Sequence, residues 1–368
     1  MEIMKTTQPI SYNTNPITSS RKLKKFGHNL FFSLGVPVVF ALIAITLASI
    51  AGETLFIKPG DSNATLRNVM LFVKSVTLTI IAAMALNANL NSGRMDFSLG
   101  ATGILAALLA SLILGNDISS IKNIVLFLVL TMIIGMILGF INSLVFIALK
   151  LPPIVLSLGM CLIYEGIAKI IVGSNNSHNL IDSDITGNFF IEPIIIIPIL
   201  IIACTIMAFA LCYTKYGYNK LALVYDQKVC VETGINEVRN CIVSYIIAGA
   251  LIGLYQVIDT CSLSTVSIKV DLGSSTAVFK NFLPIFIGGI IAKYNNQIVG
   301  LLLAVISTTL LNTGMDAATS IGFTADVQSL ITGFSVFAVL VYMVDKNRFV
   351  NWIKKRKYIH IKRKLKEE

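Results

Sequence analysis

Ten long apolar runs follow one another along the chain, and hydrophobic residues are continuous rather than alternating within each run. A helix needs about 20 apolar residues to cross a hydrocarbon core, where only helices or closed barrels satisfy their backbone hydrogen bonds. Continuous runs favour helices, so the pattern predicts an all-α polytopic membrane protein with about ten transmembrane helices. These are residues 29–51, 67–88, 96–115, 124–149, 153–173, 191–214, 240–260, 281–292, 298–315 and 326–345, of which 281–292 is a short half-helix.

The composition supports a membrane protein. The 368 residues are 55% hydrophobic and 13% charged, and the mean hydropathy is +0.81. Soluble domains carry about 25% charged residues, so this chain has too little polar surface to cover a water-facing globule of its size. As descriptions of the whole chain, a soluble enzyme, a nucleic-acid binder and a disordered scaffold are excluded.

The net charge of +10 is concentrated at the two ends. Residues 1–28 hold five basic residues and residues 346–368 hold ten, against fourteen in the 317 residues between them. Basic flanks on an apolar body predict that both termini are cytoplasmic. The alternative, a nucleic-acid-binding tail, is less favoured because the basic stretches adjoin predicted helix ends. We therefore predict a cytoplasmic segment 1–28, a transmembrane domain 29–345 and a cytoplasmic tail 346–368.

Ten crossings place every loop on a consistent side of the membrane. The segment 173–190 falls outside and carries Asp182 and Asp184 but no Lys or Arg, whereas the basic loop 215–239 falls inside. The helices divide into 29–173 and 191–345, five each, and an odd number per half permits two inverted repeats. Both halves carry glycines in their third helix, and we expect these helices to be interrupted at 95–103 and 284–289.

Motifs for catalysis are missing from the sequence. It has no GxxxxGK[ST] phosphate loop, no HExxH and no GxSxG, and its three histidines lie in terminal or loop segments. We therefore expect no enzymatic activity, no metal site and no cofactor in this chain. The cluster at Asp182 and Asp184 leaves a membrane-embedded transferase as a remote alternative.

Two polar features lie at the edges of apolar runs. Asp96 and Ser98 suit the N-terminal cap of the helix that follows them; the segment is either a capped helix start or a re-entrant element lining a conduit. Glu165 and Lys169 are four residues apart on one helix face in the favourable order for an ion pair. That pair either serves function in the membrane or only neutralises charge.

The loop 215–239 is the longest polar segment between predicted helices. Its core, 224–236, predicts a short helix that ends at Gly234, because glycine is favoured just past a helix C-terminus. The loop is either a simple connector or a docking surface for an ATPase.

Five short stretches, in order, resemble the permease subunits of bacterial sugar-type ABC importers, the ribose, galactose and autoinducer-2 group. The similarity extends over most of 67–345 and includes a GGIDLSVG-like and a PPFIVTLG-like stretch. The matching residues are 94–100 (RMDFSLG), 139–143 (GFINS), 152–159 (PPIVLSLG), 232–236 (ETGIN) and 287–289 (IGG). The chain departs from the family pattern at Arg94, where glycine is usual, at Glu165, where a basic residue is common, and near Lys280, where an acidic residue is often found.

The resemblance implies roles for particular residues. It assigns a translocation pathway to Met95, Asp96, Phe97, Ser98, Gly100, Asn142, Pro153, Ser157, Gly159, Glu165, Gly288 and Gly289. It assigns an ATPase-coupling loop to Tyr225, Asp226, Lys228, Glu232, Thr233, Gly234 and Ile235.

The resemblance also implies partners. They are cytoplasmic ATPase subunits that bind ATP, a second permease chain, identical or not, and an extracytoplasmic solute-binding protein at a bacterial plasma membrane. Because charge within the apolar runs is sparse, we expect a small neutral solute, a monosaccharide or polyol. The main alternative is an ion-gradient-driven secondary transporter, for which only Glu165 and Asp96 offer mid-membrane ionisable sites.

Overall fold

The computed structural model describes residues 19–57, 62–90, 94–115, 120–175, 177–179, 190, 192–292, 294 and 296–341. Of residues 19–32, 193, 224, 225 and 277 it describes the backbone alone. The predictions for residues 1–18, for the tail 346–368 and for Asp182 and Asp184 fall outside the described residues.

The described chain is almost entirely helical. Its helices are α1 (Ser19–Ile50), α2 (Ser62–Leu90), α3 (Leu99–Ile113), α4 (Ile121–Leu149), α5 (Pro153–Val172), α7 (Pro193–Cys212), α8 (Lys215–Tyr225), α9 (Gln227–Glu232), α10 (Glu237–Leu263), α11 (Ser275–Lys280), α12 (Phe282–Ile291) and α13 (Gln297–Ala317). A 3₁₀ turn (Thr319–Ile321) and a helix over Ala325–Val341 follow α13. Two short strands, β1 (Ser177–Asn179) and β2 (Thr265–Ser267), pair antiparallel with Ser177 opposite Ser267.

Each predicted apolar run overlaps a helix of the structure. Among the described residues, seven helices are long and apolar enough to cross a membrane: α1, α2, α4, α5, α7, α10 and α13. Three shorter apolar helices, α3, the α11–α12 unit (Val278–Ile291) and Ala325–Val341, fall on the remaining predicted segments. The chain is thus a multi-pass all-α membrane protein, while ten crossings and inverted repeats stay predictions.

The expected interruptions at 95–103 and 284–289 are wrong in position. Helix α3 begins at Leu99 and continues through Gly103, and Pro284 and the two glycines lie within α12. Pro284 is accommodated because it is the third residue of α12, where a backbone N–H has no intrahelical acceptor. The chain instead breaks at Asn281, between α11 and α12.

Helix α10 is the centre of the bundle. In its most apolar stretch 67% of the residues are buried, against 17% in α1 and in α7. Helices α4 and α10 approach closely through glycines: a Cβ on Gly249 would lie 2.1 Å from the carbonyl oxygen of Gly135. Exposed aliphatic side chains cover the outer helices, for example Ile170 (82% exposed) and Ile194 (80% exposed). These surfaces suit lipid contact.

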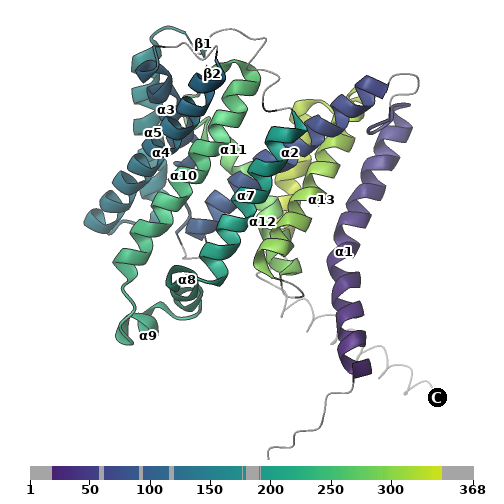
Figure 1. The fold of residues 1–368 in the computed structure, drawn as a ribbon, viewed down its shortest axis with the longest axis horizontal. Coiled ribbons are helices and arrows are strands. Elements are labelled where there is room, and N and C mark those ends of the chain that lie inside the picture. Colours follow the sequence, from purple (N-terminus) through teal and green to yellow (C-terminus); the bar gives the residue numbers. More distant parts are fainter. Residues whose placement is uncertain are drawn as a thin grey trace, which may run out of the picture.

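The two ends of the molecule differ in structure. Helices α8 and α9 lie at the end opposite to β1 and β2 (Figure 1). Helix α1 runs along the edge of the molecule beside α13 (Figure 1), where the Cα of Ala44 lies 2.5 Å from the position that a Cβ on Gly314 would take. The bundle around α10 therefore stands between an end that carries short polar helices and an end that carries a small strand pair.

Candidate solute pathway and coupling segment

A hydrogen-bonded network joins the segment before α3 to three helices. The Asp96 carboxylate accepts from the Ser98 N–H (2.9 Å), the Ser98 hydroxyl (2.6 Å) and the Asn89 amide (3.2 Å). Asn142 of α4 donates to the Ser98 hydroxyl (2.9 Å) and accepts from the Tyr164 hydroxyl of α5 (2.8 Å). All five residues, which we call the α3 network, are buried. Buried polar groups need such partners, and here they supply them to one another.

The predicted capping role of Ser98 is wrong. Ser98 is the N-cap residue of α3, but its side chain makes no cap hydrogen bond to the helix. Its hydroxyl donates to Asp96 instead, and Asp96 accepts the N–H of Ser98 itself. The hydroxyl oxygen accepts from the Asn142 amide and not from a backbone N–H of α3, so it is used by the network and not by the helix start.

The predicted Glu165–Lys169 ion pair is also wrong. Arg94–Glu237 is the one salt bridge within 4 Å between described residues. The buried Glu165 carboxylate accepts from the backbone N–H groups of Leu272 (2.9 Å) and Ser274 (2.8 Å) and from the Ser274 hydroxyl (2.5 Å). Lys169 donates to the carbonyl of Asn175 (2.9 Å). Glu165 thus holds the turn that leads into α11.

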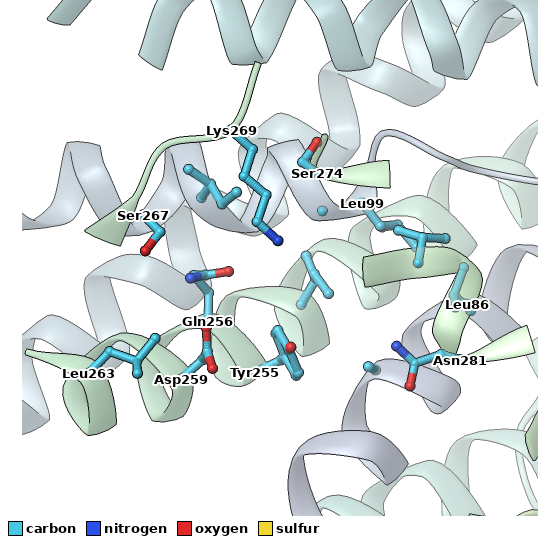
Figure 2. A pocket seen from close by; sticks show the side chains of 15 residues that line it. Leu86, Leu99, Tyr255, Gln256, Asp259, Leu263, Ser267, Lys269, Ser274 and Asn281 are labelled. Carbon is cyan, nitrogen blue, oxygen red and sulfur yellow. The ribbon is translucent and has the colours of Figure 1, made fainter. Parts of the chain in front are cut away.

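Two adjoining cavities lie beside α10. One of about 170 Å³ lies between α2, α3, α10, β2 and α11, and one of about 360 Å³ extends toward α13. They share four lining residues, and we call them together the α10 cavity. In Figure 2, Lys269, Asp259 and Gln256 project toward the same space. The shared residues are Tyr255, Asp259, Lys269 and Asn281.

The wall of the α10 cavity is polar and charged. Asp259 and Lys269 line both parts and Lys280 lines the larger part, and Asp259 lies within electrostatic reach of Lys74 of α2 as well as of Lys269. Charged side chains thus gather at one cavity, although charge within the predicted apolar runs is sparse overall. Lys74 and Asp259 were missed, although a single charged residue inside a predicted span is itself a functional signal.

Most residues that the resemblance assigns to a pathway do not line this cavity. Gly100 does, and Phe97 packs behind it against the rings of Phe279 and Phe282, at 4.9 and 5.9 Å between centroids. Asp96, Ser98, Asn142 and Glu165 are occupied by the contacts described above. The other assigned residues also lie outside both parts of the cavity. Met95 and Pro153 are half-buried, and Gly159 and Gly289 are exposed. Ser157 is bonded to the Ile154 carbonyl, and Gly288 packs on Leu301.

The predicted short helix in the loop 215–239 is confirmed as α9. Asp226 caps it by accepting the N–H of Val229 (3.1 Å), and Gly234 follows its end with φ +92°. Lys228, Glu232 and Thr233 are exposed, as are the apolar Val229 (52%) and Val231 (47%). Cys230 is buried, and its carbonyl accepts from the Ile235 N–H (3.0 Å) at the C-terminal end of the helix. Of Tyr225 only the backbone is described.

Helix α8 was not predicted, because its sequence reads as a polar connector. Lys220 is 3% exposed, and its ammonium donates to the Asn87 carbonyl near the C-terminus of α2 (2.8 Å). Burial lowers the pKa of Lys220 to about 7. Tyr216 shares a hydrogen bond with Ser244 of α10 (3.0 Å), and burial raises its pKa, partly offset by Ser244 and by the Arg94 charge. Helix α8 thus ties α9 to the ends of α2 and α10.

Comparison with known protein families identifies one family that matches most of the chain. Residues 68–340 match the family described as the permease component of branched-chain amino acid transport systems, from α2 to the helix after α13 and without α1. Neither a curated protein nor a solved structure gives a match. The matched family is one of transport permeases and not an enzyme class, and its members work with an ATPase and a binding protein. The chain belongs to the branched-chain amino acid and sugar-type family of ABC-transporter permeases.

Proposed function

We propose that this chain is the permease subunit of an ABC importer and forms the pathway for a small, neutral, hydroxyl-rich solute, a monosaccharide or polyol. The observation that carries the proposal is the polar α10 cavity within a chain of the ABC permease family. Amide and carboxylate groups on a cavity wall can form hydrogen bonds with neighbouring hydroxyl groups of a solute. The side chains that would do so are Gln256, Asn281 and Asp259, with Ser267 and Ser274 beside them and the Tyr255 ring as an apolar wall.

Asp259 offsets only part of the positive charge around the cavity. Its carboxylate lies within electrostatic reach of Lys74 and Lys269, and opposite charges weaken each other's field at the solute. With Lys280 on the wall of the larger part, the lysines outnumber the one carboxylate among the described lining residues. The preference for a neutral solute therefore rests on the side chains that pair with hydroxyl groups and not on a balance of charge.

The same pair favours a second candidate, a zwitterionic amino acid. An ammonium group could pair with Asp259 and a carboxylate with Lys269, and both side chains line one cavity. The name of the matched family points to the same class. Uptake measured with a sugar and with an amino acid separates the two candidates.

The energy source in this proposal is an ATPase partner. The exposed face of α9, which combines Val229 and Val231 with Lys228 and Glu232, offers an apolar and charged surface for docking. Two permease chains, ATPase subunits and a solute-binding protein would form the assembly in a bacterial plasma membrane, with α8 and α9 on the cytoplasmic side. The family match supports this over a carrier driven by an ion gradient.

The test is uptake by the complete transporter in proteoliposomes. The chain, its ATPase and its binding protein are reconstituted with ATP at the ATPase side, and [14C]ribose and [14C]leucine are supplied on the other side. We expect ATP-dependent uptake, and Asp259→Asn lowers it at least tenfold because a charged cavity ligand is removed. Asp271→Asn is the matched control, since Asp271 is exposed, lies outside both parts of the cavity and has φ +57°, which asparagine tolerates.

Three results would overturn parts of the proposal. Solute movement by the purified chain alone, without the ATPase, would favour a secondary carrier. Uptake of leucine without uptake of ribose would replace the sugar with the amino acid. Equal uptake by Asp259→Asn and Asp271→Asn would remove the α10 cavity from the pathway.

A further inference from the structure

Arg94 is a buried cation at the start of the segment that leads into α3. Its side chain is 5% exposed, and its Nη2 donates to Oε1 of Glu237 at 2.7 Å. Its guanidinium carbon lies 5.5 Å from the centroid of the Phe146 ring of α4, within the range of a cation–π contact. A buried charge is stable only when it is paired, so Glu237 fixes the position of Arg94.

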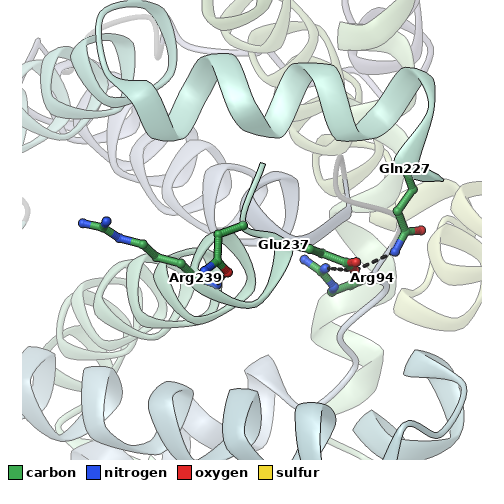
Figure 3. Close-up of polar contacts among 5 residues, drawn as sticks. Arg94, Gln227, Glu237 and Arg239 are labelled. Atoms are coloured by element: carbon green, nitrogen blue, oxygen red, sulfur yellow. Dashed lines mark hydrogen bonds and ion pairs between the residues drawn. The ribbon is translucent and has the colours of Figure 1, made fainter. Parts of the chain in front are cut away.

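The same carboxylate oxygen binds α9. Oε1 of Glu237 accepts from the side-chain amide of Gln227 at 2.6 Å. Gln227 is the first residue of α9 and Glu237 is the first residue of α10. One oxygen atom therefore joins three segments of the chain, and Figure 3 shows both dashed contacts meeting there. We call Arg94, Glu237 and Gln227 the Arg94 junction.

A continuous set of contacts leads from the Arg94 junction to the α10 cavity. Arg94 is two residues from Asp96, which is fixed by the α3 network. Four residues further, Gly100 in the first turn of α3 lines the cavity and lies against the Ser274 carbonyl. A shift of α9 can therefore reach the cavity wall through hydrogen-bonded side chains and the backbone between Arg94 and Gly100.

The Arg94 side chain also has an unused hydrogen-bonding group. Nη1 is buried and has no hydrogen-bond partner among the described residues. A buried unpaired N–H of a charged group is costly. The site can therefore accept a second acceptor when the surrounding segments rearrange, as expected for a contact that changes during a cycle.

We propose that Arg94 and Glu237 are positioning residues that couple movement of α9 to the α3 wall of the α10 cavity. The inference rests on the proposed function, because α9 is taken as the surface that the ATPase moves. When the ATPase displaces α9, Gln227 pulls on Glu237, and Glu237 carries Arg94 and the start of α3 with it. Loss of the Arg94 junction leaves ATP hydrolysis running without movement of the cavity wall.

The test measures ATP hydrolysis and solute uptake on the same proteoliposomes of the complete transporter. We expect Arg94→Ala and Glu237→Gln to keep hydrolysis within about twofold of the unmodified protein and to lower the solute moved per ATP at least tenfold. Gln227→Ala, at the exposed surface, should lower that ratio about threefold. Arg239→Ala is the matched control, because Arg239 follows Glu237 by two residues and points away from the junction in Figure 3.

The ratio separates coupling from folding and from the proposed function. A variant that merely folds poorly loses hydrolysis and uptake together, and Gln227→Ala then decides the matter, since its side chain is exposed. A ratio within twofold of the unmodified value in Gln227→Ala and Glu237→Gln overturns the inference while ATP-dependent uptake still stands. An equal fall in Arg239→Ala overturns it as well. Absence of ATP-dependent uptake in the unmodified transporter would instead refute the proposed function.

Discussion

The α3 network and the α10 cavity are two polar regions that meet at α2 and α3, and they differ in how their side chains are satisfied. In the α3 network the carboxylate, hydroxyl and amide groups of Asp96, Ser98 and Asn142 bind one another. In the α10 cavity Asp259 and Lys269 face an open volume. Polar groups that are satisfied internally hold helices together, whereas polar groups that face a cavity are available to a solute.

This difference teaches how to interpret polar residues in an apolar chain. Position in a motif identified Asp96, and spacing from Lys169 identified Glu165, yet both are occupied by protein donors. Asp259 lies in no motif and lines the cavity. Removal of a group from the first region should therefore cost stability, and removal of a group from the second should cost transport.

The largest expected effect is on stability, at Glu165, which lies outside the α3 network but is likewise satisfied by protein donors. Glu165→Ala leaves the N–H groups of Leu272 and Ser274 and the Ser274 hydroxyl without their acceptor. Each orphaned buried donor costs about 1–3 kcal/mol, so we expect a loss of about 3 kcal/mol in the free energy of unfolding. Thermal unfolding of the purified protein in mild detergent measures this loss.

Lys169→Ala on the same helix is the control for Glu165. Lys169 contacts exposed backbone carbonyls, and surface substitutions of this kind change stability by about 0.5 kcal/mol or less. A loss in Lys169→Ala as large as in Glu165→Ala would restore the ion pair that the sequence predicts.

Local patterns were enough to predict the apolar helices but not the polar helix α8 or the contacts of the candidate site. Continuous apolar runs predicted a helix in each segment, and Gly234 predicted the end of α9. The partners of Glu165 are 107 and 109 residues away, and Arg94 and Glu237 are 143 residues apart. A spacing rule that compares residues on one helix face has no access to such pairs, which is why it paired Glu165 with Lys169. Glycine content likewise suggested interruptions where the structure has close packing.

An intermediate effect is expected where the two regions meet, at Gly100. A Cβ at this position would lie 2.2 Å from the carbonyl oxygen of Ser274, so Gly100→Ala must push α3 and the turn before α11 apart. Overpacking of this kind costs about 1–3 kcal/mol, and uptake should fall with it because both segments line the cavity. Unfolding and uptake are measured on the same preparation.

Gly159→Ala provides the contrast with Gly100. Gly159 lies in α5, and nothing stands within 4 Å of the position of an added Cβ. Alanine is the better helix former by about 1 kcal/mol, so we expect unchanged or slightly raised stability and normal uptake. A defect in Gly159→Ala equal to that in Gly100→Ala would place the pathway along α5, as the resemblance implied.

The effect confined to the smallest part of the molecule is expected at Lys220, which combines the features of both regions: it is buried, but among the described residues it donates to a single carbonyl. Burial lowers its pKa from 10.5 to about 7, so the docked helix α8 binds fewer protons than the undocked helix between these two values. Docking therefore becomes more stable as the pH rises above about 7, by about 1 kcal/mol per pH unit, and is least stable below pH 7. Hydrogen-exchange protection of the α8 amides, corrected for the intrinsic exchange rate, should rise between pH 7 and pH 9.

Lys220→Met removes the titrating group and should abolish this slope, while Lys228→Met, on the exposed surface of α9, should retain it. A slope that persists in Lys220→Met would assign the pH dependence to another group.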